Sequence, residues 1–97
     1  MKGNSVYKIP DGKLVKVHLD FDKDIIVSVK IFGDFFMYPE EGIEKLESSL
    51  AGKKLVEKDL VQAISDARDL HGLEFFGLSP EGLATAILMA KEGALNA

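Results

Sequence analysis

The sequence contains no cysteine and no tryptophan, and only three of its 97 residues are proline. Without thiols the chain cannot form disulfides, zinc–thiolate sites, iron–sulfur ligation or a cysteine nucleophile. The longest mainly apolar run, residues 83–90, is far below the ~18 residues that suggest a membrane span. The first five residues lack the apolar segment of a secretory signal. Together these absences favour a cytoplasmic protein.

Positive and negative charges are unevenly distributed along the chain. Residues 1–33 carry six lysines and four aspartates, a net +2, whereas residues 34–97 carry six basic and twelve acidic residues, a net −6. Such separation can orient a charged partner, although exposed strands and helices also carry lysine and glutamate without further meaning. With a pI of about 5.1 and no basic cluster interleaved with aromatics, nucleic-acid binding is not expected.

The first third of the chain has the pattern of antiparallel strands. Residues 9–13 combine Pro10, Asp11 and Gly12 in a hairpin turn that places Tyr7 opposite Val15. Two alternating segments follow, joined by residues 22–24 as a three-residue loop. This loop predicts the buried pairs Phe21–Ile25, Leu19–Val27, Val17–Val29 and Val15–Ile31, with Lys16 beside Lys30 and His18 beside Ser28 on the opposite face.

The remaining two thirds are predicted to be helical. A first helix begins at residues 39–41 and stops at Gly52, a second spans residues 57–70, and a third is capped by Ser79 with Pro80 in its first turn. The fold class is therefore α+β, a three-stranded antiparallel meander followed by about three helices packed on one face. The 97 residues form a single domain, with residues 1–5 and 92–97 loosely held.

A corner at Gly33 and Asp34 leads from the third strand towards the first helix, and large apolar side chains surround it. A domain of this size cannot bury all of them, and exposed apolar patches usually mark interaction sites. Of two successive residues, Phe35 and Phe36, one is expected in the core and the other on the surface. The interface candidates are Gly33, Asp34, Phe35, Phe36, Met37 and Tyr38.

Other polar groups do not form a recognisable catalytic or metal site. Lys8, Lys16 and Lys30 are candidates for a basic face that meets a partner or a phosphate, although strand lysines also protect sheets from aggregation. His18 and His71 have no third ligand nearby in the sequence, so no metal site is expected. The glutamates at positions 40, 41, 44 and 47 are typical of a solvated helix face.

Taken together, residues 13–17, 25–36, 50–52 and 77–83 resemble the C-terminal accessory domain of lipoate–protein ligases. The most specific part is the corner Gly33-Asp34-Phe35-Phe36 behind an apolar strand. Because no large catalytic domain is present, the chain is most similar to the separately encoded small subunit of a bipartite, archaeal-type ligase. The resemblance also implies a fold similar to sulfur-transfer and cluster-scaffold proteins.

The resemblance implies a function in a complex. In this family a catalytic subunit activates lipoate with ATP to lipoyl-AMP and transfers the lipoyl group to a lysine of an acceptor domain. The small subunit would be a non-catalytic partner in a heterodimer, with ATP, Mg and lipoate held by the catalytic subunit and no cofactor of its own. No catalytic residue is assigned to this chain.

Two alternatives stay open at this point. Lys23 follows an aspartate at a predicted hairpin tip, which resembles the way in which lipoyl-type acceptor domains present their modified lysine, so the chain could itself be an acceptor. It could also be a cysteine-free relative of sulfur-transfer scaffold proteins that acts as a protein-binding module.

Overall fold

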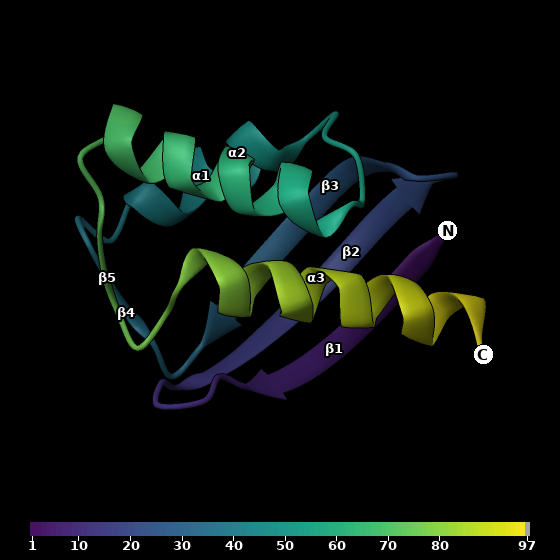
Figure 1. The fold of residues 1–97 in the computed structure, drawn as a ribbon, viewed down its shortest axis with the longest axis horizontal. Coiled ribbons are helices and arrows are strands. Elements are labelled where there is room, and N and C mark those ends of the chain that lie inside the picture. Colours follow the sequence, from purple (N-terminus) through teal and green to yellow (C-terminus); the bar gives the residue numbers. More distant parts are fainter. Residues whose placement is uncertain (97) are drawn as a thin grey trace.

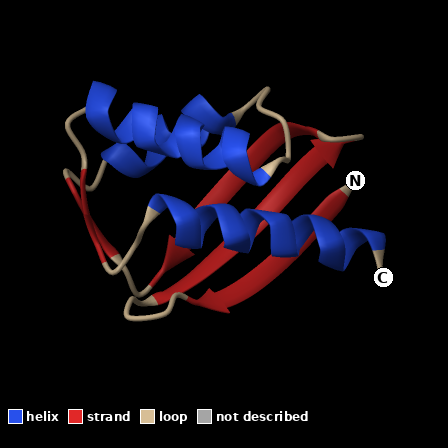
Figure 2. Ribbon diagram, in the orientation of Figure 1, coloured by secondary structure: helices blue, strands red, loops and turns tan. Residues whose placement is uncertain are grey.

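The chain folds as a layer of helices on one face of an antiparallel sheet, as a computed structural model of residues 1–96 shows (Figures 1 and 2). The sheet has the order β1-β2-β3, and α3 packs on β1 and β2 while α1 packs on β3. The predicted α+β class is confirmed. Two short strands that the sequence did not reveal, β4 and β5, form a second sheet. The elements are β1 (Lys2–Lys8), β2 (Leu14–Asp22), β3 (Ile25–Gly33), β4 (Phe36–Tyr38), α1 (Gly42–Leu50), α2 (Glu57–Leu70), β5 (Glu74–Phe76) and α3 (Pro80–Leu95).

The first hairpin agrees with its prediction. Tyr7 lies opposite Val15, and the turn is closed by a hydrogen bond from the Ile9 amide to the Lys13 carbonyl of 3.2 Å. In this turn the left-handed conformation, for which a glycine such as Gly12 is best suited, is taken by Asp11, with φ of 59°. Asp tolerates this conformation better than most residues, so the turn forms with the roles exchanged.

The predicted register between β2 and β3 is wrong. The loop has two residues, so that Asp22 pairs with Ile25 and Phe21 with Ile26, and a β-bulge between Asp20 and Phe21 follows. The bulge leaves Val27 as an extra residue on β3, because Asp20 then pairs with Ser28. Strict alternation fails at this point, and the true pairs are Leu19–Val29, Val17–Ile31 and Val15–Gly33.

The bulge also changes which β3 side chains enter the core. Ile26 is buried, whereas Ile25 and Val27, both predicted to face inward, are exposed. Ile26 is fixed further by the segment after α1, since its amide donates to the Lys53 carbonyl at 3.0 Å. The long-range contact with this segment therefore helps to set the register that the local pattern misassigned.

The helices begin and end close to the predicted positions. The range of α2 agrees with the prediction, and the Ser79 Oγ accepts a hydrogen bond of 3.0 Å from the Gly82 amide at the start of α3. α1 begins later than predicted, because residues 39–41 form a turn in which the Gly42 amide donates to the Pro39 carbonyl. Within residues 1–96 no helix has the length and apolarity needed to cross a membrane.

The first residues are not loose, contrary to the prediction. β1 begins at Lys2, Gly3 is buried against α3, and the Ser5 Oγ donates to the Ala86 carbonyl at 2.6 Å. α3 likewise continues to Leu95, so most of the predicted loose C-terminal segment is helical; residue 97 lies outside the described part. The N-terminal strand is thus an integral part of the sheet that carries the helices.

Candidate partner-binding surface

The corner after β3 is fixed by the backbone. Gly33 has φ of 148°, and a side chain there would collide with the Leu14 carbonyl. The Asp34 amide donates to that same carbonyl at 2.9 Å, while the Asp34 side chain is exposed. The corner therefore depends on a glycine and a backbone hydrogen bond, rather than on capping by the Asp34 carboxylate.

The sequence predicts that the chain continues from this corner towards a helix, but it first forms another strand. It forms β4, which pairs with β5 through Phe36–Phe76, Met37–Phe75 and Tyr38–Glu74. Each strand has only three residues, and they are separated by two helices in the sequence. A local sequence pattern does not predict the pairing of two such short strands from distant parts of the chain, although the aromatic composition of residues 74–76 is typical of strands.

Alternation in this small sheet divides its side chains between the core and the surface. Met37 is buried, and Phe75 packs against the core together with Phe35. Phe36, Tyr38 and Phe76 face outward and are 49%, 61% and 50% exposed. The ring centroids of Phe36 and Phe76 lie 5.8 Å apart. These three residues are called the aromatic surface below.

A shallow groove continues the aromatic surface towards the main sheet. It has a volume of about 250 Å³ and is lined by residues of β3, the corner, β4 and α1, among them Phe32 and Phe36. Phe32 is 41% exposed, and the ring of His18 meets it edge-on with centroids 4.8 Å apart. Phe32 therefore stands between the aromatic surface and the open face of the three-stranded sheet.

The three candidate lysines lie on this open face, which the helices leave uncovered (Figure 1). Lys16 has Phe32 and Val6 as its cross-strand neighbours, and His18 has Lys30. The predicted neighbours, Lys16 beside Lys30 and His18 beside Ser28, are wrong by two residues, as are three of the four predicted core pairs. The offset places a positive charge directly beside an exposed phenylalanine.

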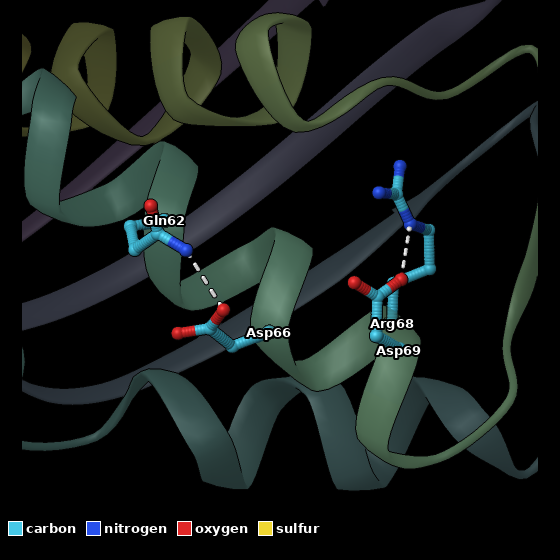
Figure 3. Close-up of polar contacts among 4 residues, drawn as sticks. All are labelled: Gln62, Asp66, Arg68 and Asp69. Carbon is cyan, nitrogen blue, oxygen red and sulfur yellow. Dashed lines mark hydrogen bonds and ion pairs between the residues drawn. The ribbon is translucent and has the colours of Figure 1, made fainter.

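Among residues 1–96, the helical side has a hollow along α1 but no pair of exposed aromatic rings. The polar contacts on α2 are local, from the Gln62 Nε2 to Asp66 at 2.8 Å and from the Arg68 Nε to Asp69 at 3.3 Å (Figure 3). In the described part of the chain, no three His, Asp or Glu side chains are grouped as a metal site would require. The surface around the corner is therefore the strongest candidate for function.

Comparison with known proteins gives this surface its context. The model of the bacterial lipoate protein ligase C-terminus matches residues 7–87. The chain belongs to this family. It is 36% identical over 77 residues to lipoate-protein ligase A subunit 2 of Thermoplasma acidophilum, with 76% of each chain covered. It is also similar to a chain in a solved structure from the same organism, which contains a bi-partite lipoate protein ligase and its E2 lipoyl domain. The two chains superimpose with a TM-score of 0.76 and 33% sequence identity, and the match covers 90% of this chain and 94% of the other.

Membership of the lipoate–protein ligase C-terminal family bears on both alternatives. Lys23 does lie at a hairpin tip, with φ of 56°, but the family model and the similar relative are those of a ligase and its subunit. The matches therefore favour the ligase-subunit hypothesis over the acceptor hypothesis. The sulfur-transfer reading is limited to kinship of fold, because the sequence holds no cysteine to carry sulfur.

Glu47 has a role that the sequence did not indicate. Its Oε2 accepts a hydrogen bond of 2.7 Å from the Ile31 amide on the outer edge of β3, and its Oε1 lies 3.8 Å from the Lys30 Nζ. The other edge of β3 pairs with β2, so this carboxylate occupies a donor that a further strand would otherwise use. Glu47 is thus part of the protection of an edge strand in this family member, beside the groove at the corner.

Replacing Glu47 with alanine is expected to lower the free energy of unfolding by about 1–2 kcal/mol, because the Ile31 amide loses its partner. The exposed edge should also promote self-association at high concentration. Urea denaturation and light scattering after gel filtration would measure the two effects. Glu44→Ala, one turn earlier on the same helix, is the matched control; equal effects in both variants would remove the edge role of Glu47.

Proposed function

We propose that this chain is a non-catalytic accessory subunit that forms a heterodimer with a separate catalytic subunit of a lipoate–protein ligase. Together the two subunits would activate lipoate with ATP to lipoyl-AMP and transfer the lipoyl group to lysines of acceptor domains. The observation that carries the proposal is the match to a ligase subunit over most of both chains. The exposed aromatic surface supports it, since it offers a partner a place to bind.

The role of such a subunit would be to complete and close the active site of its partner. Closure excludes water from a hydrolysable acyl-adenylate and fixes the positions of the reactants. ATP and lipoate are substrates of the complex, and we place them with Mg at the catalytic subunit. The cytoplasmic location stays a prediction.

The interface candidates divide according to their exposure. Phe36 and Tyr38 are available to a partner, whereas Met37 and Phe35 support them from the core side. Gly33 and the Asp34 backbone hold the corner that orients β4. We therefore assign the contact with the catalytic subunit to the exposed members of the set, and the shape of the surface to the others.

Reconstitution tests the proposal directly. The catalytic subunit alone is expected to form little lipoyl-AMP, and addition of this chain should accelerate its formation at least about tenfold. Release of pyrophosphate and chromatography of the adenylate would follow the reaction. This chain alone should form none. Equal rates with and without it would show that the catalytic subunit needs no accessory partner and would end the proposal.

A further inference from the structure

We infer that the interface with the catalytic subunit extends from the aromatic surface onto the basic end of the open sheet face, where it meets an acidic surface of that subunit. The basic end consists of Lys8, Lys16, His18 and Lys30. This inference rests on the proposed function and adds to it the second half of the contact and the charge of the partner there.

The size of the aromatic surface is the first reason. The three rings of the aromatic surface and the adjoining Phe32 are each about half exposed, which amounts to roughly 400 Å² of aromatic area. A stable heterodimer buries about 800 Å² on each partner. Even with Phe32, the aromatic surface therefore supplies about half of the area, and the contact must continue onto a neighbouring part of the molecule.

The geometry favours the open sheet face as that neighbour. The groove of about 250 Å³ joins Phe36 to Phe32, and Phe32 in turn lies on the open face beside Lys16. Val6, which is 58% exposed, lies on the other side of Lys16 and extends the apolar contact area. A partner that covers the aromatic surface and follows the groove would thus reach Lys16 directly.

Charge identifies the chemistry of the partner at this end. Lys8, Lys16 and Lys30 give +3 on a chain whose net charge is −4, which leaves −7 for the remaining residues. Within residues 1–96, Lys8 donates to the Ile9 carbonyl, and neither Lys8 nor Lys16 makes an ion pair. Lys30 has Glu47 at 3.8 Å but is still 73% exposed.

Two acids of the same face lie towards the β2–β3 turn, and one of them, Asp20, shares a hollow with His18 and Lys30. Asp20 and Asp22 are near the β2–β3 turn, and Asp20 is 3.6 Å from the amino terminus.

Asp34, which follows the corner, and Glu40, which lines the groove, are exposed acids on the side of the aromatic surface. The positive charge at this end is therefore confined to the strand positions of Lys8 and Lys16, and an acidic surface of the approaching subunit would meet it there.

Charge reversal at Lys16 tests the inference with the purified catalytic subunit. Lys16→Glu is expected to weaken the heterodimer about three- to tenfold at low salt and to reduce the salt dependence of its Kd. Lys58→Glu is the matched control, because Lys58 is equally a surface lysine but lies in the first turn of α2 on the helical side. Thermal unfolding of both variants verifies that the fold is intact.

The outcomes separate the inference from the proposed function. If Lys16→Glu binds like the wild type while the wild-type chain still accelerates lipoyl-AMP formation, the inference is wrong and the accessory function stands. The inference also fails if Lys16→Glu loses affinity only for the acceptor domain, since the basic end would then face a different protein. If the wild-type chain neither binds nor activates the catalytic subunit, both proposals fall together.

Discussion

Replacement of Phe36 by alanine is expected to weaken binding to the catalytic subunit by about 2 kcal/mol, roughly 30-fold in Kd. Phe36 lies at the centre of the contact that we propose: its ring meets Phe76 at 5.8 Å and it lines the groove towards Phe32. A ring that a partner covers completely loses most of its binding contribution on truncation. Calorimetry or surface plasmon resonance with the purified subunit would measure the change.

Two other variants make this experiment specific. Leu70 on α2 is 79% exposed, more than Phe36, but it lies outside the proposed contact. Leu70→Ala should therefore leave the affinity for the catalytic subunit unchanged. Phe35→Ala should lower stability, because Phe35 packs on the core. Wild-type affinity in a folded Phe36→Ala variant would move the interface away from the aromatic surface.

A second large effect is expected at Gly3, where alanine should lower the free energy of unfolding by about 3 kcal/mol. An added Cβ would collide with the Ala90 carbonyl of α3 and lie 2.9 Å from the Ala94 Cβ. The carbonyl belongs to the helix backbone, so the clash is relieved only if α3 moves away from β1. Urea denaturation monitored by circular dichroism would measure the loss.

Gly93→Ala is the matched control for this prediction. Gly93 lies on α3, and its added Cβ would be 3.4 Å from the Asn4 carbonyl, without a severe clash. Alanine favours the helix by up to about 1 kcal/mol over glycine, so this variant should be as stable as the wild type or more stable. If Gly3→Ala were equally harmless, the close approach of β1 and α3 would not contribute to stability.

Elements with strong local signals were predicted well from the sequence. The Ser79 cap, the range of α2 and the turn that pairs Tyr7 with Val15 depend on residues close in the chain. The α+β class follows from the same signals, because strands precede helices. The corner with its large apolar side chains also pointed to the candidate surface before the structure showed which of them are exposed.

The errors occur where distant segments decide the structure. The alternation of β3 predicted Val27 in the core, but the bulge and the contact of Ile26 with Lys53 turned it outward. Residues 1–5 seemed loose because nothing local shows that Gly3 meets α3. The glutamates of α1 looked uniformly solvated, although Glu47 reaches the Ile31 amide.

The amino-acid sequence by itself determined the fold class, the helix boundaries set by caps, and the concentration of aromatic residues at the corner, since each depends on local propensity and patterning. Only the tertiary structure decided which aromatic rings remain exposed and which lysine stands beside them. Pairing of β4 with β5 turned Phe36 and Phe76 outward together, and the bulge in β3 placed Phe32 next to Lys16. Both depend on contacts between segments far apart in the chain, which local pattern does not encode.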